Sequence, residues 1–210
     1  RAARAAAAVA HGDEDDARER LGALAVSAEP AALLAGAFAA GALPDPALED
    51  ALLAALERAA PFLTYAFERR SFLAFDRDDA LTAARALSVA VELAPDSDLY
   101  WTNLGWAWYL LGFLDRSEGA SLRALQLDAS QVIARYNLGL VQVVTDRLDD
   151  AMASYRETVR WAAEVDAEAV ADLVDAETRY PDAIGVPFAL AFLLEQSGDR
   201  AAAAEAYERY

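Results

Sequence analysis

Apolar and small residues recur along the chain at a fixed distance. The stretch from Trp101 to Gly105 is echoed one repeat later, and both Leu104 to Leu138 and Gly105 to Gly139 span 34 positions. Leu114-Asp115 and Leu148-Asp149 keep the same step. A period near 34 residues is typical of helix-turn-helix repeats, which stack so that neighbouring units bury a continuous core.

Glycine and proline residues between the apolar stretches predict where the helices end. Gly12, Gly41, Gly112 and Gly198 stand where a helix should stop, because glycine adopts the left-handed conformation easily. Prolines mark further boundaries, since proline cannot continue a helix. The pattern predicts about thirteen helices, near residues 2–11, 14–28, 31–41, 46–59, 62–75, 78–93, 98–111, 115–127, 132–145, 148–162, 166–179, 183–197 and 199–210.

One irregularity interrupts the repeat. The equivalent turn positions Asp146 and Gly198 are 52 residues apart, which is 34 plus 18, so we expect an extra helix inserted at about 166–182. No linker is long enough to separate two domains, and we therefore predict a single domain over residues 1–210. Its clearest repeats are 64–97, 98–131 and 132–165, and its degenerate repeats are 1–29, 30–61 and 184–210.

Composition supports an all-α fold and argues against some classes of binding partner. Residues of the apolar class make up 56% of the chain, with alanine and leucine dominant, and no strand-length run alternates apolar with polar residues. The formal charge of 18 − 35 = −17 argues against nucleic acid and anionic membranes, which are bound through cations. No apolar stretch approaches the length of a membrane span. The compartment stays open, with a cytoplasmic location slightly favoured.

The repeat resembles the tetratricopeptide repeat (TPR). Trp101, Leu104, Gly105 and Trp108 fill the signature positions of its first helix. Other units match in part, at Leu138, Gly139, Ala151, Tyr155, Ala83, Leu87, Ala90, Pro95, Gly198, Ala203 and Tyr207. The resemblance implies a right-handed α-solenoid of about 12–13 helices, in which the first helix of each pair lines a concave face.

The resemblance also indicates which side chains would line that face. The expected peptide-binding residues are exposed positions between the core ones, at Arg69, Phe72, Thr102, Asn103, Trp106, Tyr109, Tyr136, Asn137 and Leu140.

Two features of this row of expected peptide-binding residues favour binding of a partner. Asn103 and Asn137 repeat at one slot, where amides could hold a peptide backbone or bond locally. The aromatic residues Phe72, Trp106, Tyr109 and Tyr136 form a wall that either meets a partner or is covered by the inserted helix or a terminal helix. Apart from Arg69 the row is neutral or apolar, so an amphipathic helix or extended apolar segment fits it better than a carboxylate.

Motifs for catalysis and cofactors are missing from the sequence. There is no cysteine and only one histidine, His11, which stands at the end of a helix and is expected to cap it. We find no phosphate loop, nucleophile elbow or calcium-loop spacing. We therefore expect no enzyme activity, no cofactor and no metal site.

The leading hypothesis is a non-catalytic scaffold that binds a peptide or helix of another protein in the concave groove. A second hypothesis is a structural, self-assembling TPR protein. A third is a regulatory region of a larger enzyme, because one fold serves many functions.

Overall fold

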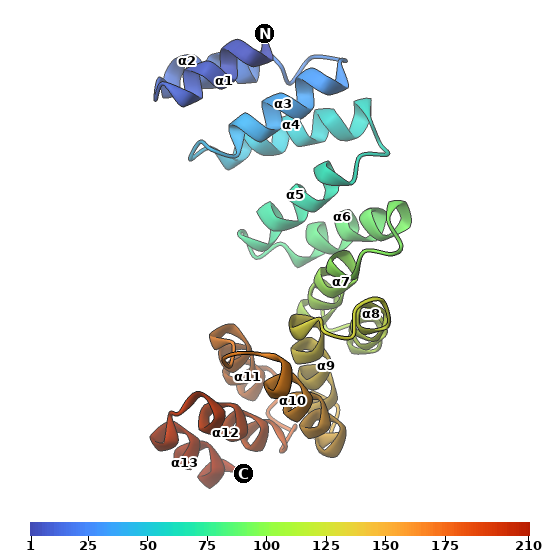
Figure 1. Cartoon of the computed structure of the whole chain (residues 1–210), viewed down its shortest axis with the longest axis vertical. Coiled ribbons are helices and arrows are strands. Elements are labelled where there is room, and N and C mark those ends of the chain that lie inside the picture. Colours follow the sequence, from blue (N-terminus) through green and yellow to red (C-terminus); the bar gives the residue numbers. More distant parts are fainter. The chain divides into compact units, whose positions relative to one another are not determined.

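The computed structural model describes all residues, 1–210, and every element in it is an α-helix (Figure 1). The prediction of an all-α fold with about thirteen helices is therefore confirmed. The chain divides into two compact units, the N-terminal unit Arg1–Pro95 and the C-terminal unit Asp96–Tyr210. Each unit is described by itself, and the grouping of all repeats into a single domain stays a prediction.

The N-terminal unit consists of three helical hairpins. Each pair, α1 with α2, α3 with α4 and α5 with α6, is in contact, and consecutive pairs also contact one another. Leu33, Leu52, Leu53 and Leu56 are fully buried and form the centre of its core. The helices are α1 Ala2–Ala10, α2 Glu14–Gly22, α3 Pro30–Ala40, α4 Pro46–Ala59, α5 Thr64–Phe75 and α6 Ala80–Leu93.

The C-terminal unit has three hairpins and one additional helix. The pairs α7 with α8, α9 with α10 and α12 with α13 are each in contact, and α11 contacts α9 and α12. The inserted helix predicted near 166–179 is present as α11. The helices are α7 Asp98–Leu110, α8 Leu114–Leu127, α9 Val132–Val144, α10 Leu148–Trp161, α11 Ala167–Arg179, α12 Val186–Ser197 and α13 Arg200–Arg209.

The turn inside the hairpins repeats its backbone conformation every 34 residues. Gly112 has φ 78°, and Asp78 and Asp146, one repeat on either side, have φ 56° and 58°. Aspartate tolerates this left-handed conformation better than most residues, so it can replace glycine there. The expected left-handed glycine is also found at Gly12 and Gly198, whereas Gly41 has φ −63° and the expectation was wrong there.

Close approach of the paired helices explains the glycines of the repeat. A Cβ atom on Gly139 would lie 2.8 Å from two ring carbons of Tyr155, and one on Gly105 would lie 3.0 Å from Ser121 Oγ. Tyr155 is only 1% exposed, so its ring has no free space into which to move. The small residues of the signature therefore serve packing, as the repeat pattern predicts.

Candidate protein-interaction faces

The predicted binding residues are divided between the two units. Arg69 and Phe72 lie in the N-terminal unit, and the other seven lie in the C-terminal unit. The slot of Phe72 recurs at Phe38, Trp106 and Leu140, each 34 residues from the next, so every first helix from α3 to α9 carries a large apolar side chain there. The surroundings of this slot differ between the units.

In the N-terminal unit the slot is open to solvent. Phe38 on α3 is 72% exposed and Phe72 on α5 is 37% exposed. Tyr65 is half-buried and stacks on Phe38, with ring centroids 6.0 Å apart and an interplanar angle of 24°. Tyr65, Arg69 and Phe72 follow the spacing i, i+4, i+7 and form one stripe along α5. We call Phe38, Tyr65, Arg69 and Phe72 the open face.

The cation on the open face is already paired. Arg69 donates to Glu49 Oε1 from Nε at 2.9 Å and from Nη2 at 2.7 Å, and this hydrogen bond raises the pKa of Arg69. Glu49 is 4% exposed and stands at a slot where Ala83 and Ala151 keep the repeat's small residue. A buried charge needs such a partner, so Arg69 joins α5 to α4 and is not a free anion site. The acidic residue in a small-residue slot was the signal that the sequence offered for this pair.

In the C-terminal unit most of the predicted row is buried. The expectation of exposure was wrong for Thr102 (2% exposed), Tyr109 (1%), Tyr136 (4%), Asn137 (6%) and Leu140 (3%). Asn103 and Trp106 are half-buried, and Trp106 stacks on Tyr109 with ring centroids 5.3 Å apart. We call Tyr109, Tyr136 and Leu140 the covered face. A role of these side chains in peptide binding is not tested by their burial and stays a prediction.

The helix α11 covers this face. At its start the Asp166 backbone N–H donates to the Tyr136 hydroxyl at 3.4 Å. At its end Arg179 donates to the Leu110 carbonyl and places its guanidinium 5.6 Å from the centre of the Tyr109 ring. Between these points the buried residues of α11, which is labelled in Figure 1, are Ala169, Leu173 and Ala176. The alternative in which the inserted helix covers the aromatic wall therefore holds in the C-terminal unit.

Of the two asparagines that share one repeat position, only Asn137 donates a hydrogen bond to another helix. Asn137 Nδ2 donates to the Thr102 carbonyl at 3.5 Å, which links α9 to α7. Asn103 Nδ2 is buried without a hydrogen-bond partner. The amide at Asn137 thus links neighbouring first helices, so it is not a surface amide that bonds locally, and a role in peptide binding stays a prediction.

Polar groups beneath α11 are poorly satisfied. The hydroxyls of Tyr109 and Tyr155 are buried and have no hydrogen-bond partner, and burial raises the pKa of both. Asp172 on α11 faces the same region. Burial is the main cause that raises the pKa of its carboxyl group to about 7, and Glu168, Asp166 and Asp175 add to the effect. Such groups cost stability when they stay unpaired.

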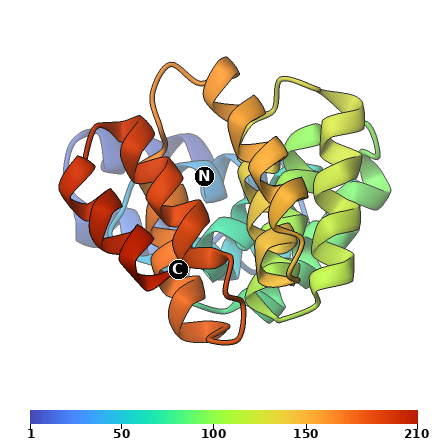
Figure 2. The same cartoon turned by 90° about the horizontal axis from the view of Figure 1, so that it is seen from below.

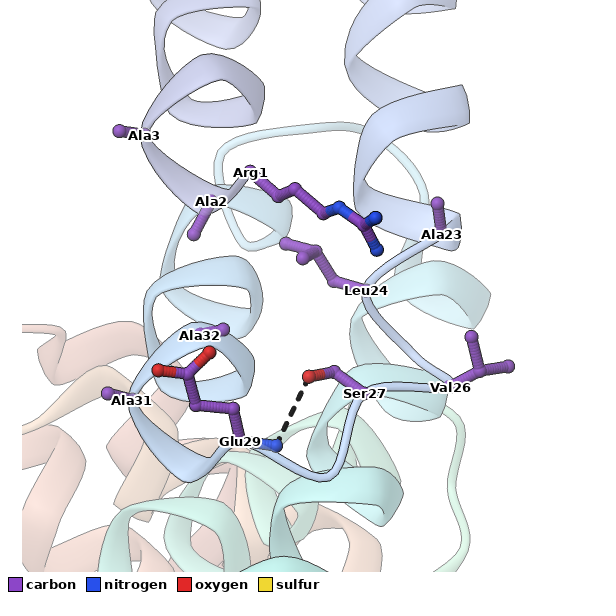
Figure 3. A pocket seen from close by; sticks show the side chains of 10 residues that line it. All are labelled: Arg1, Ala2, Ala3, Ala23, Leu24, Val26, Ser27, Glu29, Ala31 and Ala32. Atoms are coloured by element: carbon purple, nitrogen blue, oxygen red, sulfur yellow. Dashed lines mark hydrogen bonds between the residues drawn. The ribbon is translucent and has the colours of Figure 1, made fainter.

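A cavity of about 630 Å³ lies at the start of the chain (Figure 3). Half of its lining residues are alanines, and its charged side chains are Arg1 and Glu29. Ser27 Oγ accepts a hydrogen bond from the Glu29 backbone N–H at 3.1 Å, so this hydroxyl already has a partner. Alanine offers no directional contact to a ligand, which makes this cavity a weaker candidate than the helix faces.

Two features that would bear on function are absent from the structure. No three His, Asp or Glu side chains are gathered in a way that could hold a metal ion. No helix combines the length and the apolar character needed to cross a membrane. The single histidine, His11, lies at the C-cap of α1, where the sequence pattern predicts it.

Comparison with known proteins gives the fold a name. The chain is similar to YrrB, described as a TPR protein with an unusual peptide-binding site, with a TM-score of 0.65, 13% identity and coverage of 86% of this chain and 93% of YrrB. The chain has the tetratricopeptide-repeat fold. It is also similar to MamA 41-end from Desulfovibrio magneticus RS-1, with a TM-score of 0.63, 19% identity and coverage of 75% and 90%.

A second MamA structure extends this likeness. Its TM-score is 0.63 at 18% identity, with 86% of this TPR chain and 88% of MamA covered. No protein-family model matches the chain, and no curated protein matches it either. At these identities the likeness shows the TPR fold alone, so the function has to be argued from the faces of this chain.

Proposed function

We propose that this TPR chain is a non-catalytic protein-interaction scaffold whose open face binds an amphipathic helix of another protein. The observation that carries the proposal is the exposed aromatic group on α3 and α5, where Phe38 is 72% and Phe72 is 37% exposed. Exposed aromatic side chains that lie together on a rigid support are typical of binding sites, and aromatic residues are common anchors.

The covered face supports a helix as the ligand. There the corresponding slot of the repeat, at Leu140, is buried in a core that includes residues of α11, an amphipathic helix of the chain itself. A helix that lays its apolar side into a groove is a common mode of peptide recognition. The open face offers apolar side chains at the same slot of the repeat, and its own unit contains no comparable covering helix.

Charge favours a neutral or basic partner helix. The N-terminal unit has nine arginines and fifteen acidic residues, so its formal charge is 9 − 15 = −6. The one cation on the open face is paired with Glu49. An acidic partner would meet repulsion from this unit, whereas a basic one would be attracted.

Site-specific photo-crosslinking tests the proposal. A photoreactive phenylalanine analogue is placed singly at Phe38, Phe72 and Phe62, where Phe62 is the control because it is 70% exposed but lies in the turn before α5. We expect positions 38 and 72 to capture the same protein and position 62 to capture none of it. The purified partner should then bind Phe38→Ala and Phe72→Ala more weakly than Phe62→Ala. Equal capture at all three positions would count against the open face.

Self-assembly is the second candidate function, and an aromatic cluster on the last hairpin favours it. The Phe188 ring lies 5.5 Å from that of Tyr207 and 5.0 Å from that of Tyr210, and the two tyrosines are 38% and 58% exposed. Light scattering over a range of concentrations tests it. A mass that stays monomeric at high concentration excludes this candidate.

A further inference from the structure

The helix α11 is docked in the manner of a ligand. Its buried residues Ala169, Leu173 and Ala176 follow the spacing i, i+4, i+7, which is the apolar stripe of an amphipathic helix. Its basic end is held by Arg179, which bonds to the end of α7 and lies over the Tyr109 ring. The stripe has two alanines and one leucine, with Val170 partly buried beside it, and this is little buried apolar surface for a helix of this length.

The polar contacts of α11 show an imperfect fit. The half-buried Asp172 carboxyl group forms no hydrogen bond or ion pair, and the nearby hydroxyls of Tyr109 on α7 and Tyr155 on α10 are buried without partners. The other titratable groups facing this region are Tyr136 on α9, and Arg179 and Tyr180 at the end of α11. The charged neighbours that act on Asp172 are Asp166, Glu168 and Asp175, all of them acids. A helix that belonged there permanently would satisfy these groups better.

The connections of α11 allow it to move while its neighbours stay folded. Residues 162–166 before it and 180–185 after it are not helical, and Figure 2 shows the first of these as an extended loop leading to α11. Helix α12 packs on α11 and also contacts α10 and α9, which remain its neighbours when α11 leaves. Release of α11 would remove the contacts that Asp166 makes with Tyr136 and that Arg179 makes with Tyr109.

We propose that α11 is an exchangeable occupant of the covered face, and that an amphipathic helix of a partner protein binds there by displacing it. This rests on the proposed function only in taking a helix as the ligand, since it concerns the other unit. The chemistry of the partner follows from that of α11. Its stripe has small residues around a central leucine, it ends in an arginine, and it has a neutral hydrogen-bonding residue at the position of Asp172.

The exchange depends on pH in a defined direction. The pKa of Asp172 is raised to about 7 in the docked state, above its ordinary value of 3.8, so the docked state binds the proton more tightly than the released state. Docking of α11 therefore weakens as pH rises from about 4 to about 7, and the partner helix competes best above that range.

A synthetic peptide tests the exchange in the full-length chain. The probe is a fluorescent peptide of residues 164–182 with Asp172→Asn, and the control peptide also carries Leu173→Asp. Binding is measured by fluorescence anisotropy against the wild-type chain, Arg179→Ala, and Arg200→Ala as a matched arginine control on α13. We expect about a tenfold tighter complex with Arg179→Ala than with wild type, because its own α11 competes less. Arg200→Ala should equal wild type.

Additional variants and measurements test whether the probe binds by displacing α11. Asp172→Asn in the chain should weaken probe binding at about pH 8 and remove most of its pH dependence. Hydrogen exchange should show α11 opening before α9 and α12. The proposal is overturned if no variant binds the probe while circular dichroism shows them folded, or if both peptides bind equally. Dimers in light scattering that dissociate when the probe peptide is added would also overturn it, because a second copy would then be the occupant. None of these results depends on Phe38 or Phe72, so failure here is distinct from failure of the open face.

Discussion

The first helices α5 and α9 carry equivalent slots of one repeat, yet one side is open and the other is covered. Phe72 on α5 is 37% exposed, whereas Leu140, two repeats later, is 3% exposed. The C-terminal unit contains the additional helix α11, which lies against α9, and Leu140 belongs to a core cluster that includes residues of α11 and α12. A repeat position therefore fixes where a side chain points, and a helix elsewhere in the chain decides whether it meets solvent.

Among the substitutions that test this difference, one at Leu173, the buried leucine of α11, should lower the unfolding free energy most. Leu173 is fully buried, so Leu173→Asp places a charge in an apolar site and should lower the unfolding free energy of the C-terminal unit by about 3–5 kcal/mol. Urea denaturation measures the loss. Val174→Asp is the matched control, since Val174 is 51% exposed on the same helix, and it should change stability by less than about 1 kcal/mol. Equal losses would mean that α11 does not dock by this stripe.

Truncation of the same slot in the two units should give unequal costs. Leu140→Ala removes a buried side chain and should cost about 2–4 kcal/mol, whereas Phe72→Ala should cost less than about 1 kcal/mol although the side chain is larger. Thermal unfolding of both variants checks this. A larger loss for Phe72→Ala would show that the open face is covered in solution.

The buried ion pair at the open face gives a third, smaller effect. Glu49→Ala leaves Arg69 without its carboxylate and should cost about 2 kcal/mol, because charged hydrogen bonds are worth about 1.5–3 kcal/mol. Asp50→Ala is the control, since its pairs with Arg70 and Arg77 are closer to the surface and should be worth about 1 kcal/mol or less. Chemical denaturation distinguishes the two variants, and a smaller cost for Glu49→Ala than for Asp50→Ala would contradict the structural role of the pair.

The pH dependence of the unfolding free energy that Asp172 causes should be the smallest of these effects. Because the folded-state pKa of Asp172 is raised to about 7, the unfolding free energy should fall as pH rises toward that value. Asp172→Asn removes this contribution and should stabilise the chain at about pH 8 by about 1–2 kcal/mol, after allowance for solvent screening of a half-buried group. Asp175→Asn, an exposed neighbour, serves as the control. An unchanged pH profile in Asp172→Asn would show that Asp172 does not couple docking to pH.

The 34-residue step predicted the number of helices and their close packing, although α2 ends at Gly22 and the helix predicted over 14–28 was too long. Gly105 and Gly139 predicted where paired helices cross. The distance of 52 residues from Asp146 to Gly198 predicted the inserted helix α11. These features are local or periodic, so a single sequence contains them. The left-handed turns at Asp78 and Asp146 were missed because the expectation was tied to glycine.

The exposure of the binding row could not be predicted in the same way. Whether Tyr136 and Leu140 meet solvent depends on where α11 packs, and this is decided by contacts between residues distant in sequence. Tyr109 is a clear example, because Arg179 and Tyr180 cover it from about seventy residues away. The Glu49–Arg69 pair was missed for the same reason, although an acid in a small-residue slot hinted at it.

The contact between Gly139 and Tyr155 has a spectroscopic consequence. A glycine with no side chain lies against the aromatic ring, at the place where an added Cβ would be 2.8 Å from two ring carbons. The ring current of Tyr155 should therefore displace the α-proton resonances of Gly139 in the proton NMR spectrum. Those resonances give a local signal for assembly of the α9–α10 hairpin, which can be followed separately from the fate of α11.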